Sequence, residues 1–254
     1  MASTLDPLIA HLIGLELRLI ACRERLAAHT DSEALHDLRT TVRRLRSLLR
    51  PLRGLPGIDR LEDAARALGQ LTTPMRDREV LAAHLLEHGH PELAQPRRRA
   101  ATEAFSQVAR CNQLSQLLNL LSAIVPLLRT AQRNGVIEHL GRNIDKRLAK
   151  QHKRLRQALA DPAHDRHRLR LLIKRVRYAA EAYPERQPLP KGWAKALKKA
   201  QGALGDWHDH VQWLLRAEQE PELAPLKQQW QAAQDEAEGR SDKALSQLTQ
   251  LMKK

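Results

Sequence analysis

Residues 36–46, HDLRTTVRRLR, carry basic side chains at intervals of three and four positions. At about 100° per residue, this spacing predicts a helix with one basic face. The planar guanidinium group of arginine donates paired hydrogen bonds to phosphate oxygens, so several in a line suit a polymer of phosphates. The alternative is a solvated face whose long side chains cover apolar surface. The predicted basic band consists of His36, Arg39, Arg43, Arg46, Arg50 and Arg53.

The same order of residues returns at 167–177, HRLRLLIKRVR. The second band is shorter than the first, because Glu181 occupies the position that corresponds to Arg50. A solvated face explains poorly why an ordered band that begins with histidine occurs twice. We therefore favour binding to a polyanion over a solvated face. The second band consists of His167, Arg170, Lys174 and Arg177.

The correspondence extends beyond the two motifs. The offset that aligns them also places Arg25 on Arg156, and one inserted residue later Arg76 falls on His208. The expected helix boundaries agree as well, which indicates an internal repeat within one domain. The two expected helical halves are residues 1–130 and 131–254.

Both motifs need helices to position them, and the whole chain has a helical pattern. Apolar residues recur at spacings of three and four, and no run alternates with a period of two, so the expected fold class is all-α. Beside the first basic band lies an apolar band, which is expected to pack on the core and to leave the basic side chains along a groove between helices. This apolar band consists of Leu35, Leu38, Val42, Leu45, Leu49 and Leu52. The expected helices are residues 5–28, 33–53, 58–71, 74–88, 97–129, 136–160, 165–183, 191–203, 206–217 and 222–252.

Glycine and proline mark the expected breaks between helices. Thr73 and Pro74 suit an N-cap and a first helical position. Pro126 is expected to kink or split the helix over 97–129. The clearest breaks are expected at 54–57, 88–91 and 184–192.

Composition bounds the class of protein. Among 254 residues, 43 Lys and Arg outnumber 29 Asp and Glu, which gives a net charge of +14 and predicts an anionic partner. Aromatic residues make up only 3% of the chain, which is few for a protein that binds single-stranded nucleic acid by stacking aromatic side chains on the bases. The two cysteines show no metal or redox spacing, and the N-terminal segment matches neither a signal peptide nor a membrane span. A cytoplasmic protein is expected.

The motifs resemble the CHAD domain, a histidine-containing α-helical domain. The resemblance is carried by H-x-x-R-x-x-x-R-R-x-R at 36–46, H-x-x-R-x-x-x-K-R-x-R at 167–177 and LKKAQGALGDWHD at 197–209. TTPMRD at 72–77 is a weaker copy of the last, with Thr73 where the family usually has glycine. The resemblance implies two helical bundles related by a pseudo-twofold axis. It also implies a central pore or groove, lined by basic residues, that binds inorganic polyphosphate.

The resemblance further implies a cellular place and a set of binding residues. CHAD domains associate with polyphosphate granules, so we expect the same here, with phosphate or sulfate ions able to occupy the site and no cofactor. The motif residues expected to bind are His36, Arg39, Arg43 and Arg46 with His167, Arg170, Lys174 and Arg177, and Arg50 of the first basic band is expected to bind with them. Neighbouring helices are expected to add Arg25, Arg156, Lys150, Lys153, Arg76 and His208.

Two basic bands brought face to face would repel each other. We expect them to form opposite walls of a cationic channel, in which phosphate oxygens relieve the repulsion and ligand raises thermal stability. Since His36 and His167 each open a band, polyphosphate binding is expected to strengthen below about pH 6.5.

Catalytic and metal-binding interpretations are weaker. Asp77 and Asp209 suit structural roles at helix starts. His84 and His88 lie four positions apart, but no HExxH motif or cysteine pair supplies further zinc ligands. The chain also contains no P-loop, nucleophile elbow or paired-carboxylate motif, so we expect a binding protein and not an enzyme.

Three other partners are possible. A basic protein binds nucleic acid non-specifically through phosphates, and this is the main competing function. The chain would also suit an accessory or regulatory module for an enzyme of phosphate metabolism. A membrane surface fits less well, because the basic band adjoins a core seam and not an exposed apolar face. We expect no specific nucleic acid and no membrane as partner.

Overall fold

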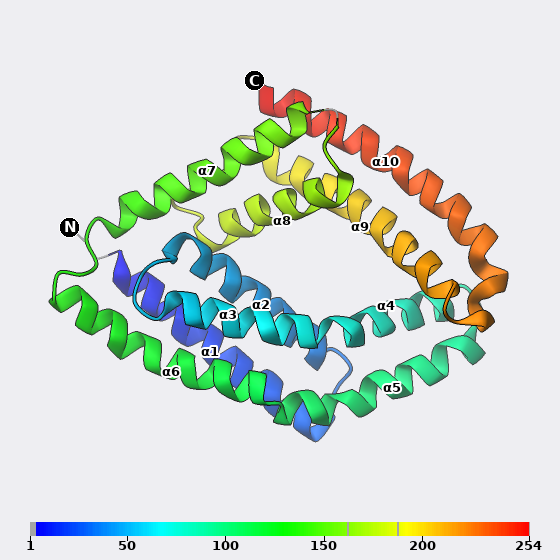
Figure 1. Ribbon diagram of the computed structural model, residues 1–254, viewed down its shortest axis with the longest axis horizontal. Coiled ribbons are helices and arrows are strands. Elements are labelled where there is room, and N and C mark those ends of the chain that lie inside the picture. Colours follow the sequence, from blue (N-terminus) through cyan, green and yellow to red (C-terminus); the bar gives the residue numbers. More distant parts are fainter. Residues whose placement is uncertain (1–3, 162, 187, 254) are drawn as a thin grey trace. The chain divides into compact units, whose positions relative to one another are not determined.

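The computed structural model describes residues 4–161, 163–186 and 188–253. In these residues the chain forms α-helices and two short 3-10 helices, without strands (Figure 1). Gln187, inside the expected break at 184–192, lies outside the described residues. The elements are α1 (Leu5–Ala28), α2 (Ala34–Leu49), η1 (Arg50–Leu52), α3 (Ile58–Leu71), α4 (Thr73–Glu87), α5 (Pro91–Arg110), α6 (Asn112–Arg133), α7 (Leu140–Ala160), α8 (Arg166–Ala182), α9 (Trp193–Ala217), η2 (Pro221–Leu226) and α10 (Lys227–Lys253).

The all-α fold is confirmed, and α1 and α3 have the expected bounds. The single helix expected over 97–129 is wrong, because the backbone is extended at Cys111 and separates α5 from α6. No glycine or proline marks this break. It follows from packing, since α5 contacts α4 and α1 whereas α6 contacts α3 and α1. Pro126 lies inside α6 and does not split it.

The break expected between 203 and 206 is also wrong, because α9 continues through Gly205. A glycine inside a helix costs about 1 kcal/mol relative to alanine, which packing along α10 and α8 offsets. Thr73 is the first residue of α4 and not its N-cap. The N-cap is Thr72, whose hydroxyl donates back to the Leu68 carbonyl of α3 at 2.9 Å.

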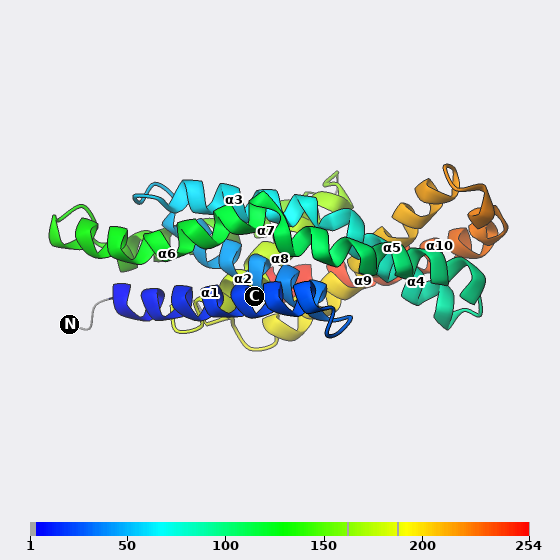
Figure 2. The ribbon, with the colours of Figure 1, turned by 90° about the horizontal axis from the view of Figure 1, so that it is seen from below.

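The chain divides into two compact units, residues 1–144 and 145–254, and the division lies within α7. In the first unit, α1 contacts α2, α5 and α6, and α2 contacts α3. Figures 1 and 2 show α1 running beside α6. All six members of the predicted apolar band of α2 and η1 are buried, which fixes the direction of the basic side chains next to them. The turn before α3 needs Gly57, whose φ is +76° and whose α-hydrogen faces Leu127.

The second unit is built on α9, which packs against α8 and α10. The short helix η2 joins α9 to α10, and the two helices run side by side (Figure 1). The core of the second unit brings together side chains from α7, α8, α9 and α10, among them Leu155, Ile173, Leu197 and Leu248. The expected halves at 1–130 and 131–254, and the internal repeat behind them, stay predictions.

Candidate anion-binding site

In the first unit, the basic band of α2 lies along its contact with α3, the α2–α3 seam. Arg39 is half-buried, and its Nη1 donates to the Gly69 carbonyl at 3.1 Å, the Thr72 hydroxyl at 2.8 Å and the Thr73 hydroxyl at 3.2 Å. Gly69 lies in the last turn of α3, where backbone carbonyls lack helical partners and favour a cation. Burial lowers the pKa of Arg39. Arg39 therefore closes the end of α3 and holds a positive charge at the seam.

The other residues of this band differ in their partners. Arg46 is half-buried, and its Nη1 lies 4.0 Å from where a β-carbon on Gly69 would stand. Arg43 is exposed, with Nη2 3.4 Å from the Thr40 hydroxyl, and its charge acts on Arg39. His36 is half-buried in the first turn of α2.

Arg50 has a carboxylate partner in the structure. Its Nε lies 3.6 Å from the carboxylate of Glu62, a residue of α3 that is only 3% exposed. Arg53 holds the same carboxylate through two hydrogen bonds, one of them 2.6 Å long. A buried carboxylate needs such cations, because an unpaired charge away from water is costly. Arg50 and Arg53 therefore compensate Glu62 and join η1 and the residue after it to α3.

Arg25 and Arg76 also face acids. Arg25 donates to both oxygens of Asp31, at 2.7 and 2.9 Å, and to Asp37 at 2.7 Å. Its hydrogen bonds lower the pKa of Asp31 to about 2. Arg76 donates to Glu79 at 3.0 Å, and burial raises the pKa of that carboxyl. The charges of both arginines are partly balanced by these carboxylates.

In the second unit, the basic band of α8 lies along its contact with α9, the α8–α9 seam. Asp165 caps α8 by accepting hydrogen bonds from the backbone N–H groups of His167 and Arg168. The ring centroids of His167 and His208 are 5.3 Å apart. We call His167, Arg170, Lys174 and His208 the α8–α9 basic cluster.

The cluster is strongly cationic. The pKa of His208 is lowered to about 4, first by burial and then by the charges of Arg170, His167 and Lys174. His208 is therefore neutral at pH 7, and it is surrounded by groups that oppose its protonation. An anion beside His208 would be attracted by the positive charges of Arg170 and Lys174.

Arg177 lies further along the same seam, and its guanidinium group already forms hydrogen bonds with other side chains. Its Nε donates to the Gln201 side chain at 2.8 Å and its Nη1 to Glu181 at 2.5 Å. The guanidinium also lies 4.4 Å from the centroid of the Tyr178 ring. Gln201 precedes His208 by two helical turns of α9, so the band follows α9 from His208 back to Gln201.

The predicted residues on α7 are exposed. Arg156 is exposed and stands 5.4 Å from the ring centroid of Trp193, at the start of α9. Trp193 and His208 are 15 positions apart, about 22 Å along the helix, so Arg156 does not join the α8–α9 basic cluster. Lys150 and Lys153 are exposed on α7.

Two features of the site were not expected from the sequence. Glu62 and Gln201 hold Arg50 and Arg177, and neither contact has a local signal, because the partners are 12 and 24 positions apart. A pocket between α7 and α8 is lined by Arg154 of α7 and by Arg168 and Arg175 of α8. The only signal for this pocket in the sequence was the spacing of seven positions between Arg168 and Arg175.

No metal site stands out in the part of the chain that is described, where no three histidine, cysteine, aspartate or glutamate side chains come together. His84 and His88 contact each other, with ring centroids 4.0 Å apart, and His88 Nδ1 lies 2.8 Å from the His84 carbonyl oxygen. The helix α6 is long and apolar enough to cross a membrane by length and composition. One such helix is weak evidence for a membrane span, because core helices of soluble proteins meet the same criterion, and α6 contacts α1 and α3.

The CHAD domain model matches residues 12–218, a stretch that includes both basic bands and the segment 197–209. The chain belongs to the CHAD domain family. A crystal structure of the CHAD domain from the plant Ricinus communis is similar, with a TM-score of 0.70 and 27% sequence identity, covering 96% of this chain and 89% of that chain. No curated protein is detectably similar in sequence. CHAD domains are in general non-catalytic binding domains, and α2, α8 and α9 carry the motifs of this one.

Proposed function

We propose that this CHAD domain binds inorganic polyphosphate along the basic bands of α2 and α8. The proposal is carried chiefly by the α8–α9 basic cluster, where neighbouring cations help to lower the pKa of His208 to about 4. Like charges held close together repel, and the repulsion is stronger where protein replaces water. Phosphate oxygens between these side chains would remove that repulsion and gain charge-assisted hydrogen bonds.

The length of the bands favours a polymer over a single ion. His167 and Arg177 are ten positions apart, about 15 Å along α8, and the α2 band from His36 to Arg46 has the same length. A chain of linked phosphates presents a charge at each of several points along such a line. The acids that hold Arg25, Arg50 and Arg177 restrict the orientation of these arginines, which suits positioning more than direct contact.

The proposed role is that of a binding module without catalytic residues or a cofactor. It would attach the protein to polyphosphate granules in the cytoplasm or serve an enzyme of phosphate metabolism as an accessory module. Duplex DNA and RNA are the competing ligands, because their phosphates attract any basic surface.

The test compares two double variants that remove the same charge. Arg43→Gln/Lys174→Gln takes one cation from each band, whereas Arg60→Gln/Lys198→Gln takes two exposed cations of α3 and α9 that belong to neither band. We expect the first to weaken binding of long-chain polyphosphate about tenfold or more at about 150 mM salt, since cation–phosphate contacts are charge-assisted. The second should bind like the wild type.

Competition with duplex DNA completes the experiment. Polyphosphate binding that persists in an excess of DNA, and that only the band variant loses, supports the proposal. Equal loss in both variants would mean that affinity follows net charge and not the bands. Displacement of polyphosphate by DNA at equal phosphate concentration would favour nucleic acid instead.

A further inference from the structure

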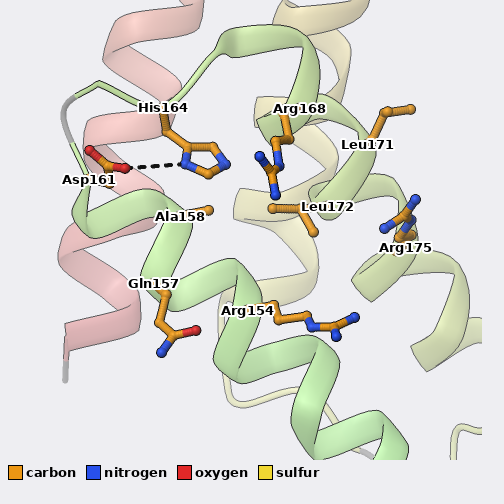
Figure 3. Close-up of a pocket in the computed structure, with 9 residues that line it drawn as sticks. All are labelled: Arg154, Gln157, Ala158, Asp161, His164, Arg168, Leu171, Leu172 and Arg175. Carbon is orange, nitrogen blue, oxygen red and sulfur yellow. Dashed lines mark ion pairs between the residues drawn. The ribbon is translucent and has the colours of Figure 1, made fainter.

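A pocket of about 670 Å³ opens between α7 and α8, within the second unit. Figure 3 shows Arg154 extending from α7 and Arg168 from α8 into the space between the helices, with Leu172 between them. Arg175 lies two turns further along α8, on the same face as Arg168. We call Arg154, Arg168 and Arg175 the pocket arginines.

The pocket and the α8–α9 seam occupy different faces of α8. Arg168 and Arg175 follow His167 and Lys174 by one position each, which turns them by about 100° around the helix. The side chain of Leu172 packs against the core between these faces. A ligand in the pocket therefore contacts other residues than a ligand on the seam.

Two carboxylates of α8 and α10 are held by other arginines. Arg166 holds Asp242, and Arg177 holds Glu181. Asp161, on the rim, accepts from the Ala163 backbone N–H at 3.0 Å and faces His164. Within residues 4–161, 163–186 and 188–253, no carboxylate lies at ion-pair distance from the pocket arginines.

His164 adds a polar group to the wall. Its side chain is 16% exposed, and Nδ1 lies 3.6 Å from the Asp161 carboxylate. Its Nε2 is buried, and no group in the described part of the chain forms a hydrogen bond with it. Buried polar atoms are nearly always hydrogen-bonded, so Nε2 indicates a polar ligand or water in the pocket. Figure 3 shows the His164 ring on the same side of the pocket as Arg168.

We propose that this pocket is a second anion site, specific for a short chain of linked phosphates such as inorganic triphosphate. The pocket arginines supply three planar guanidinium groups, each of which can donate paired hydrogen bonds to phosphate oxygens. Arg168 and Arg175 are about 10 Å apart along α8, which several linked phosphates span better than one phosphate ion. Leu171 and Leu172 add apolar surface to the pocket wall.

The test measures binding of inorganic triphosphate by calorimetry to the full chain at about 150 mM salt. We expect Arg168→Gln/Arg175→Gln to weaken triphosphate binding about tenfold or more, because it removes two charge-assisted contacts. The matched control Lys195→Gln/Lys198→Gln, which removes two exposed charges from α9, should stay within about twofold of the wild type, as expected for charges screened by salt. In the wild type, the side-chain N–H signals of the pocket arginines should shift on titration with triphosphate.

Three results would contradict the proposal: no triphosphate binding to the wild type, unchanged affinity in the pocket variant, or inorganic phosphate binding as tightly as triphosphate. The seam variant Arg170→Gln/Lys174→Gln separates this proposal from the polyphosphate function. Triphosphate binding retained in the seam variant supports an independent pocket. If the seam variant loses triphosphate and the pocket variant does not, triphosphate binds at the seam and the pocket proposal fails alone.

Discussion

Individual side chains of the basic bands fall into two groups. Arg25, Arg50 and Arg177 face carboxylates: Asp31 before α2 for Arg25, Glu62 of α3 for Arg50, and Glu181 of the same helix for Arg177. Arg39 is held by backbone and hydroxyl oxygens and keeps a full positive charge without an acid partner among its hydrogen bonds. Residue type and spacing alone predicted all of these as ligands, because Glu62 and Gly69, which hold Arg50 and Arg39, come from another helix.

His208 gives a prediction about pH. Its pKa is about 4 in the folded chain against an ordinary 6.5, so between these values the unfolded chain binds the proton and the folded chain does not. Stability of the free protein should therefore fall as pH decreases from 6.5 towards 4. An anion beside His208 raises that pKa, so polyphosphate affinity should rise over the same range. His208→Gln should reduce both effects, as measured by thermal unfolding and by titration.

Other groups also titrate in this range, so the difference between proteins is the quantity to compare. His11→Gln is the control, because burial lowers the pKa of His11 as well, and His11 lies on α1. If wild type and His208→Gln gain affinity equally on acidification, His208 takes no part in binding.

Single helices show how far the sequence alone could predict the site. The apolar band of α2 fixed its orientation correctly, since all six members are buried. The break at Cys111 could not be predicted, because it depends on which helices α5 and α6 contact. The pocket between α7 and α8 was missed for the same reason. Arg154 and Arg168 belong to different helices, and only packing brings them to one cavity.

Replacing each of two glycines by alanine should change the stability of the protein in opposite directions. Gly205 lies inside α9, and a β-carbon there would have no neighbour within 4 Å, so Gly205→Ala should stabilise the protein by about 0.5–1 kcal/mol. Gly57 has a φ of +76°, and a β-carbon would lie 2.7 Å from Leu127 Cδ2, so Gly57→Ala should destabilise it. Denaturant unfolding of both variants checks this. Equal effects would mean that backbone conformation at these positions does not govern stability.

The whole molecule carries a net charge of +14, which makes any anion bind to some extent. The salt dependence of the affinity distinguishes this general attraction from binding at the basic bands. In a plot of log affinity against log salt, Arg43→Gln/Lys174→Gln should lower the slope by about two, one for each lost phosphate contact. Arg60→Gln/Lys198→Gln, of equal charge, should leave the slope nearly unchanged. Equal slopes in the two variants would show that binding is distributed over the surface.

The division within α7 has a consequence for folding. Each unit buries its own set of apolar side chains, and the second core is complete with residues of α7 to α10. Residues that share a hydrophobic core unfold together, so we expect two unfolding transitions on heating, one for each unit. A single melting temperature would then not describe the chain. Triphosphate should then raise only the transition of the second unit, and the calorimetric trace would report which part of the chain holds the ligand.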